Sequence, residues 1–126
     1  DYTTICASAP SEILALVALQ NRAEILARQR ERVRSNLQVL EAFLSRHSRG
    51  FEYRRPSGGS VCFPRLLFPE GAAAFCERLV RAAGIMLAPS GLFGYGDRHV
   101  RVGFGRRDLP EVLNRFSDYL AEYDAR

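Results

Sequence analysis

The stretch from Ser11 to Arg46 contains neither glycine nor proline, and it constrains the fold more than any other feature of the sequence. Glycine and proline are the residues that interrupt helices most strongly, and the stretch is far longer than an average helix of about 12 residues. Pro10 and Glu12 suit the first turn of a helix, and Ser8 or Ser11 suits its N-cap. We therefore expect a long N-terminal helix.

The apolar residues of this stretch change their distribution along it. One stripe recurs at helical spacing and consists of Leu19, Leu26, Val33, Leu37, Leu40 and Leu44. Residues 13–17 instead place apolar side chains on several sides of the helix. We expect the N-terminal end to be buried all round, the later part to be amphipathic, and any kink or break to lie near Asn21–Ala23. A helix that changes in this way often links two bodies.

Beyond this helix, the hydrophobic period changes to two. Phe51 and Tyr53 alternate with charged residues, a turn follows at 56–59, and 60–67 indicates a returning strand. We predict a hairpin from these two strands. Pro64 cannot donate a hydrogen bond to a neighbouring strand, so the returning strand should lie at an edge or near a bulge.

The remaining sequence predicts helix, strand, strand and helix in that order. The helix covers 72–83 and ends at Gly84; the strands cover 85–88 and 99–104, separated by a glycine-rich loop; and Asp108 begins the last helix. The two helices have apolar faces formed by Ala72, Phe75, Cys76, Leu79 and Ala83, and by Leu109, Val112, Leu113, Phe116, Leu120 and Tyr123. The predicted fold class is α/β in two layers (α+β), with a small, mostly antiparallel sheet covered by helices and a long N-terminal linking helix. Any parallel crossover through the 72–83 helix should be right-handed.

The reactive side chains exclude several kinds of chemistry. The sequence has 3 cysteines and 2 histidines, and Cys6, Cys62, Cys76, His47 and His99 show no metal-ligand spacing. We interpret the cysteines as small buried groups in a reducing compartment. All 18 basic residues are arginines, so no residue of this chain can form a Schiff base. No apolar run approaches the ~20 residues that span a bilayer, and no secretion signal is visible.

Arg101 is the candidate binding residue. Strand alternation in 99–104 puts Val100, Val102 and Phe104 on one face, and Arg101 and Gly103 on the other. Gly103 leaves room beside the guanidinium, whose planar set of donors suits a bidentate carboxylate. The alternative is a surface strand on which Arg101 faces water or pairs with a nearby glutamate.

The sequence between Phe75 and Gly105 carries a resemblance to a known family. It reads F-x-E-R-L-x-x-x-x-G-I-x-L-A-P-S-G-L-F-G, then a short loop, then H-V-R-V-G-F-G. This resembles the small C-terminal domain of the class I/II aminotransferases, the fold type I group that uses pyridoxal 5'-phosphate (PLP). An extended segment ending in A-P-S-E, the long helix, a P-x-G-G hairpin and a closing helix occur in the matching order, so the resemblance covers nearly the whole chain. Ser90 stands where the family often has glycine.

The resemblance implies that Arg101 binds the substrate and that the residues of this chain do not bind the cofactor. Arg101 would bind the α-carboxylate of an amino-acid or 2-oxo-acid substrate, and the reaction would be transamination or another PLP-dependent reaction at the α- or β-carbon, such as cyclisation or elimination. The Schiff-base lysine and most PLP contacts would belong to a large domain upstream. We therefore expect no catalytic, cofactor-binding or metal-binding residue in this chain, which should be inactive alone.

The resemblance also implies an assembly. Residues 1–24 would be the end of the large domain and the start of the linking helix, and 25–126 the small domain of a cytoplasmic homodimer. Thr3 to Ser11 would lie near the partner's active site or form an ordinary interdomain linker. The Gly58-Gly59 turn would face the substrate entrance or be only a hairpin turn.

The arginines of the long helix suggest a competing interpretation. The net charge is +4, and arginines crowd 22–34, as in helices that bind nucleic-acid phosphates. Glutamates at helical spacing, in the pairs Glu24–Arg28 and Glu31–Arg34, instead favour a solvated face. No nucleic-acid motif is present, so we expect neither a nucleic-acid nor a membrane partner.

Overall fold

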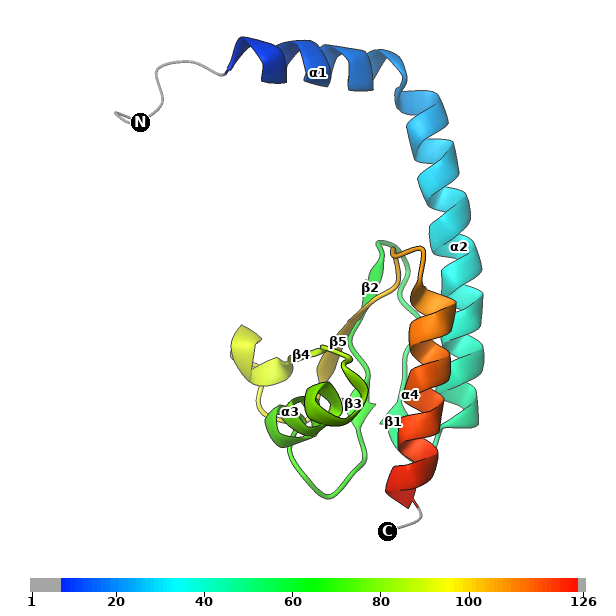
Figure 1. Ribbon diagram of the computed structural model, residues 1–126, viewed down its shortest axis with the longest axis vertical. Coiled ribbons are helices and arrows are strands. Elements are labelled where there is room, and N and C mark those ends of the chain that lie inside the picture. Colours follow the sequence, from blue (N-terminus) through cyan, green and yellow to red (C-terminus); the bar gives the residue numbers. More distant parts are fainter. Residues whose placement is uncertain (1–7, 125–126) are drawn as a thin grey trace, which may run out of the picture. The chain divides into compact units, whose positions relative to one another are not determined.

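The computed structural model describes residues 8–124, which contain four α-helices, five short strands and one 3-10 helix (Figure 1). The elements are α1 (Ala9–Gln20), α2 (Arg22–Arg46), β1 (Phe51–Glu52), β2 (Val61–Cys62), β3 (Arg65–Leu66), α3 (Ala72–Ala83), β4 (Ala88–Pro89), η1 (Ser90–Phe93), β5 (Val100–Gly103) and α4 (Leu109–Asp124). The chain divides into two compact units, Asp1–Arg32 and Val33–Arg126. The mixed fold of helices and antiparallel strands confirms the predicted class.

The first unit contains α1 and the start of α2, and the expected helix break falls at Asn21. The side-chain amide of Asn21 donates to the Val17 carbonyl oxygen at 2.8 Å, as its backbone N–H does at 3.1 Å. Ser8 is the N-cap residue of α1, but its hydroxyl makes no capping bond. The expectation that this end is buried all round is wrong, because every described residue of α1 is exposed, including Ile13 and Leu14. Apolar side chains on all sides of one helix cannot cover one another.

The amphipathic part of α2 lies in the second unit. Leu40 and Leu44 of the predicted stripe are buried, and Val33 and Leu37 pack partly buried against the core. The two earliest members of the stripe, which lie in the first unit, are exposed. The stripe therefore predicts the core contact of this helix only over its C-terminal turns.

The predicted hairpin is only half right. Phe51 of β1 does pair with Leu66 of β3, in antiparallel register. The first part of the returning segment, β2, pairs with β5 instead, so that Val61 lies opposite Gly103. Fully buried Pro64 separates β2 from β3. Because proline has no N–H, it interrupts the strand between β2 and β3, and Arg65 of β3 then both pairs with β1 and bridges to His99 beside β5.

The second sheet has the order β2-β5-β4, and all pairs between the described strands are antiparallel. The right-handed crossover rule therefore does not apply to it. The predicted strand at 85–88 is shifted, since β4 covers only Ala88 and Pro89. In β4, Ala88 pairs with Arg101 of β5.

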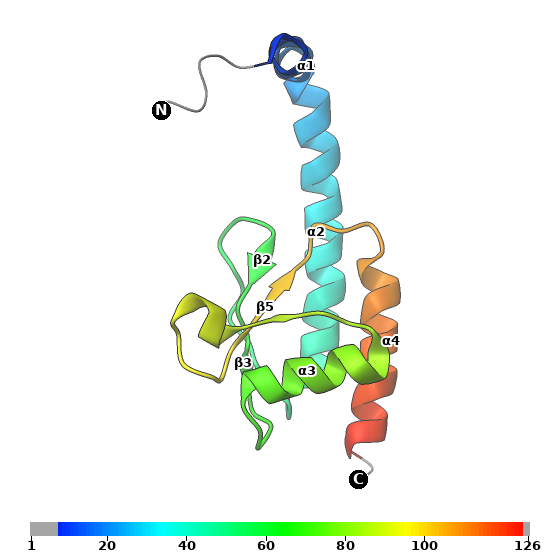
Figure 2. The same ribbon diagram turned by 60° about the vertical axis from the view of Figure 1, so that its left-hand side comes forward.

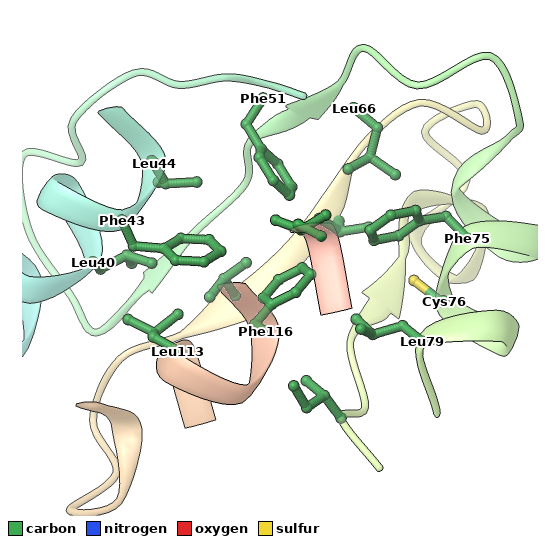
Figure 3. Close-up of a cluster of buried hydrophobic side chains, with 14 of the residues drawn as sticks. Leu40, Phe43, Leu44, Phe51, Leu66, Phe75, Cys76, Leu79, Leu113 and Phe116 are labelled. Atoms are coloured by element: carbon green, nitrogen blue, oxygen red, sulfur yellow. The ribbon is translucent and has the colours of Figure 1, made fainter. Parts of the chain in front are cut away.

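The core of the second unit lies where three helices meet the strands. Two views show α4 beside the last turns of α2 (Figure 1, Figure 2). The Phe116 ring of α4 lies 5.1 Å from the Phe43 ring of α2 and 6.2 Å from the Phe75 ring of α3, between centroids (Figure 3). Most residues of the predicted α3 and α4 faces are buried, and Tyr119 is a buried member that the pattern missed.

A loop from elsewhere in the chain caps the N-terminus of α3. Gly71 precedes the helix, and Asp97 accepts the N–H of Ala72 on its carbonyl oxygen at 3.0 Å and that of Ala73 on Oδ1 at 2.9 Å. A Cβ on Gly71 would lie 1.8 Å from Asp97 Oδ2, so a side chain there would displace the capping carboxylate. At the other end, Gly84 adopts the predicted left-handed cap with φ 64°.

Candidate functional site

Strand β5 carries Arg101 on the face of the sheet that points away from the core. Val100, Val102 and Phe104 are buried, whereas Arg101 and Gly103 are exposed. This is the alternation that the sequence predicts. It follows from the period of two along a strand, since one face must bury its apolar side chains against the helices.

The register places residues of all three strands in one row across this open face. β2 pairs with β5 at Val61 and Gly103, and the ladder resumes at the Arg65–His99 bridge. Phe63 therefore lies opposite Arg101 on one side, as Ala88 does on the other. A Cβ on Gly103 would meet nothing within 4 Å, so the space beside Arg101 is open.

An aromatic wall adjoins the guanidinium. Arg101 Cζ lies 5.2 Å from the centroid of the Phe93 ring, a cation–π geometry. Phe93 in turn meets Phe63 edge-on, at 6.0 Å between centroids. Val61, Phe63, Phe93, Tyr95 and Arg101 line a hollow of about 400 Å³. A larger hollow of about 800 Å³, lined in part by the 84–88 segment and Gly103, shares Val61 and Arg101 with it.

Arg101 makes no ion pair within residues 8–124. The ion pairs among residues 8–124 are Arg55–Glu41, Arg65–Glu52, Arg78–Glu70, Arg81–Glu77 and Arg106–Asp108. The alternative in which Arg101 pairs with a nearby glutamate is therefore wrong for this part of the chain. A guanidinium with free donors between apolar walls can bind a carboxylate of a ligand through two parallel hydrogen bonds.

The described histidines and cysteines lie against other side chains of the domain. His47 Nε2 lies 3.1 Å from Ser117 Oγ, and the His99 ring stacks on Phe63 at 5.2 Å between centroids. Burial raises the pKa of the Cys62 thiol to about 12. Burial, and to a smaller extent the charge of Asp97, raises the pKa of the Cys76 thiol to about 11. The described residues contain no group of three His, Cys, Asp or Glu side chains that would hold a metal ion.

Three other expectations have different outcomes. The chain bends at 57–60, with Gly59 at φ 80°, and neither Gly58 nor Gly59 lines the two hollows. Residues 3–7 of the segment expected near a partner subunit, and Cys6 among the cysteines, lie outside the described residues. No helix within residues 8–124 is both long and apolar enough to cross a membrane.

The predicted ion pairs of the arginine-rich segment are wrong. Neither Glu24–Arg28 nor Glu31–Arg34 occurs among the ion pairs of the described residues. Arg32 instead donates to Gln29 Oε1 at 3.0 Å. Exposed side chains gain little from pairing because water solvates both charges well.

Sequence reasoning missed two residues that shape the site. The sequence predicts a glycine-rich loop around Phe93 but no contact for it, because a loop pattern does not tell which strand residue its side chain meets. For Ser90, the sequence indicates only a place in the family motif. It is fully buried, and a serine inside an apolar run is the signal that it needs hydrogen-bond partners.

No family model matches the chain. Capreomycidine synthase from Streptomyces vinaceus is 27% identical over 125 residues, which are 98% of this chain and 32% of that protein. A PLP-dependent aminotransferase from Streptococcus suis 89-1591 superposes with a TM-score of 0.87 at 31% identity, over 97% of this chain and 33% of its own. The PLP-dependent cyclase OrfR superposes with a TM-score of 0.85 at 25% identity, over 96% of this chain and 34% of its own.

The fold is thus that of the small domain of the fold type I PLP-dependent aminotransferases, as the sequence motif predicts. The chain spans about a third of the length of the relatives it matches, consistent with a C-terminal small domain. PLP is the cofactor of the enzymes with this fold. This chain contains no lysine, so its residues do not include the one that binds PLP as a Schiff base.

Proposed function

We propose that this chain is the C-terminal small domain of a PLP-dependent aminotransferase that acts on an amino acid and a 2-oxo acid, and that Arg101 binds the substrate α-carboxylate. The observation that carries the proposal is Arg101 itself: an exposed guanidinium on the open sheet face, beside open space at Gly103, with no carboxylate among its described neighbours. The similarity to a PLP-dependent aminotransferase at TM-score 0.87 supports it.

The chemistry assigned to this chain is binding and orientation. The two oxygens of a carboxylate match two parallel N–H donors of a guanidinium, so the contact fixes the direction of the substrate as well as its position. The apolar walls lower the local dielectric constant, which strengthens the attraction between the two charges. PLP, bound by residues outside this chain, supplies the electron sink for the reaction at the α-carbon. By itself the chain is expected to be inactive.

The assembly belongs to the same proposal. Residues 1–24 would be the end of the large domain together with the start of the linking helix, and 25–126 the small domain. The whole enzyme would be a cytoplasmic homodimer of amino-acid metabolism without a nucleic-acid or membrane partner. Size-exclusion chromatography with light scattering of the whole enzyme tests the dimer.

A second candidate function is a different PLP-dependent reaction at the α- or β-carbon. It is favoured by the similarity to capreomycidine synthase, 27% identical, and to the cyclase OrfR, 25% identical. Arg101 would have the same role in it. Product analysis by mass spectrometry separates the two: a transaminase needs an amino-group acceptor and releases a 2-oxo acid, whereas a cyclase converts its amino acid without an acceptor.

The test of Arg101 uses the whole enzyme with its cofactor. Arg101→Ala should weaken substrate capture by roughly 2–4 kcal/mol, since a bidentate charge-assisted contact is lost, and so lower kcat/KM about 30- to 1000-fold. Arg107→Ala is the matched control, because Arg107 is exposed and lines neither hollow. An unchanged kcat/KM in Arg101→Ala removes Arg101 from the substrate site.

A further inference from the structure

Ser90 is a fully buried polar residue next to the Arg101 site. Its hydroxyl donates a hydrogen bond to the Gly96 carbonyl oxygen at 2.9 Å and accepts one from the His99 N–H at 3.1 Å. Its backbone N–H donates to the His99 carbonyl oxygen at 2.8 Å. Ser90, the first residue after β4, thus holds the far end of the following loop at two positions.

These bonds close the loop that carries Phe93. The Tyr95 N–H donates to the Ser90 carbonyl oxygen at 3.1 Å, and Gly94 and Gly96 turn the chain with φ 66° and 59°. The Phe93 side chain remains 48% exposed. Burial in the core therefore does not fix this ring, and beyond its edge contact with Phe63 its position against Arg101 depends on the conformation of the loop.

We propose that Ser90 is a positioning residue for the Arg101 site. Its hydroxyl holds the 91–98 loop in the conformation that puts the Phe93 ring against the guanidinium, so that Arg101 is ordered before a carboxylate binds. The assignment rests on the proposed function of Arg101. Ser90 is fully buried and does not line either hollow, so it acts through Phe93 and does not touch the substrate.

The physical reason is the cost of ordering. A free arginine side chain loses rotamer freedom when it binds a ligand, and a guanidinium already resting on a ring loses less. Without the hydroxyl, the Gly96 carbonyl oxygen and the His99 N–H lose their partner inside the protein, which favours opening of the loop toward water. The binding of substrate should suffer, while the chemical step at the cofactor should not.

The first measurement is NMR of this chain with Ser90→Ala, with Ser45→Ala on the exposed face of α2 as the matched control. In the parent and the control, the Arg101 side-chain protons should show ring-current shifts and cross-relaxation with the Phe93 ring; in Ser90→Ala both signals should be lost. Should Ser90→Ala give no folded spectrum, Ser90→Cys replaces it, because its slightly larger thiol fills the site while weakening both hydrogen bonds. Persistence of the contact in the folded variant overturns the proposal.

The second measurement is steady-state kinetics of the whole enzyme. Ser90→Ala should raise KM for the amino acid about tenfold and leave kcat within about twofold. The binding free energy lost through disorder of Arg101 is then comparable to that of about one hydrogen bond. In the Phe93→Ala background the same change should raise KM less than twofold, because its effect passes through Phe93. Equal effects in both backgrounds contradict the proposal. If Arg101→Ala leaves kcat/KM unchanged, the proposed function fails, whereas the NMR contact still decides the role of Ser90.

Discussion

The side-chain amide of Asn36 in α2 donates to the backbone carbonyl oxygen of Phe104, just after β5, at 2.9 Å. The same nitrogen donates to the Arg106 carbonyl oxygen at 2.6 Å. Asn36 is buried, so these bonds lie inside the protein and connect the long helix to the exit of the strand that carries Arg101. The helix therefore fixes one end of β5 through a polar contact as well as through its apolar face.

Replacing Asn36 by alanine should destabilise the chain. The carbonyl oxygen of Phe104 loses its donor in a buried place and that of Arg106 in a partly buried one, which costs about 1–3 kcal/mol in the free energy of unfolding. Urea denaturation followed by circular dichroism measures it. Asn114→Ala on the exposed side of α4 makes the same change in a helix and should stay within about 0.5 kcal/mol of the parent. Equal stabilities of the two variants would show that the buried bonds contribute nothing.

The capping of α3 by Asp97 leads to a second prediction. Asp97→Ala removes the acceptor of the Ala73 N–H and should lower the free energy of unfolding by about 1 kcal/mol. Asp97→Asn keeps an oxygen that accepts this bond and should lose less than half as much. Urea titrations of both variants make the comparison. If asparagine proves as damaging as alanine, the cap bond is not the source of the stability.

How much of this fold the sequence predicts depends on whether the signal is local. The α3 helix and its cap at Gly84 follow from a period of 3.6 and a glycine that accepts positive φ, and the structure has both. The partner of a strand is not local. Alternation over 60–67 shows which side chains point inward, but nothing in it indicates that the segment before Pro64 pairs with β5 and the segment after it with β1.

The candidate site divides in the same way. The direction of Arg101 follows from alternation within one strand, and the structure confirms it. Its contact with Phe93 depends on a loop closed by Ser90. The hydrogen bonds that close the loop join Ser90 to Gly96 and His99, and the sequence pattern does not indicate these partners. The burial expected for α1 was wrong because apolar residues show only that a surface can be covered, not that the described chain covers it.

The two buried thiols predict a loss of stability at alkaline pH. Burial raises the folded-state pKa from 9.0 to about 12 for Cys62 and to about 11 for Cys76. Above pH 9 the unfolded chain releases these protons while the folded chain keeps them, so unfolding becomes more favourable as pH rises. The contribution is fully present below pH 9 and is lost between pH 9 and each folded-state pKa.

Urea denaturation at about pH 8 and pH 10.5 should therefore show a fall in the free energy of unfolding of up to about 1.4 kcal/mol per pH unit for each thiol. Tyr53 adds to the fall at the upper end, because burial and then Glu41 raise its pKa from 10.0 to about 12. In Cys76→Ala, the free energy of unfolding should fall less steeply with pH, by the contribution of one thiol. A pH-independent free energy over this interval is the result that contradicts the assignment.

Arg101→Lys separates the charge at the site from its geometry. Lysine keeps the positive charge but replaces the planar guanidinium with a single ammonium group, which cannot make two parallel hydrogen bonds to a carboxylate and stacks less well on Phe93. In the whole enzyme, Arg101→Lys should lower kcat/KM about 10- to 100-fold, less than Arg101→Ala, with most of the change in KM. Arg107→Lys, at an exposed position outside both hollows, serves as the control. If lysine restores full kcat/KM, the site needs only a charge, and the bidentate binding of the α-carboxylate is wrong.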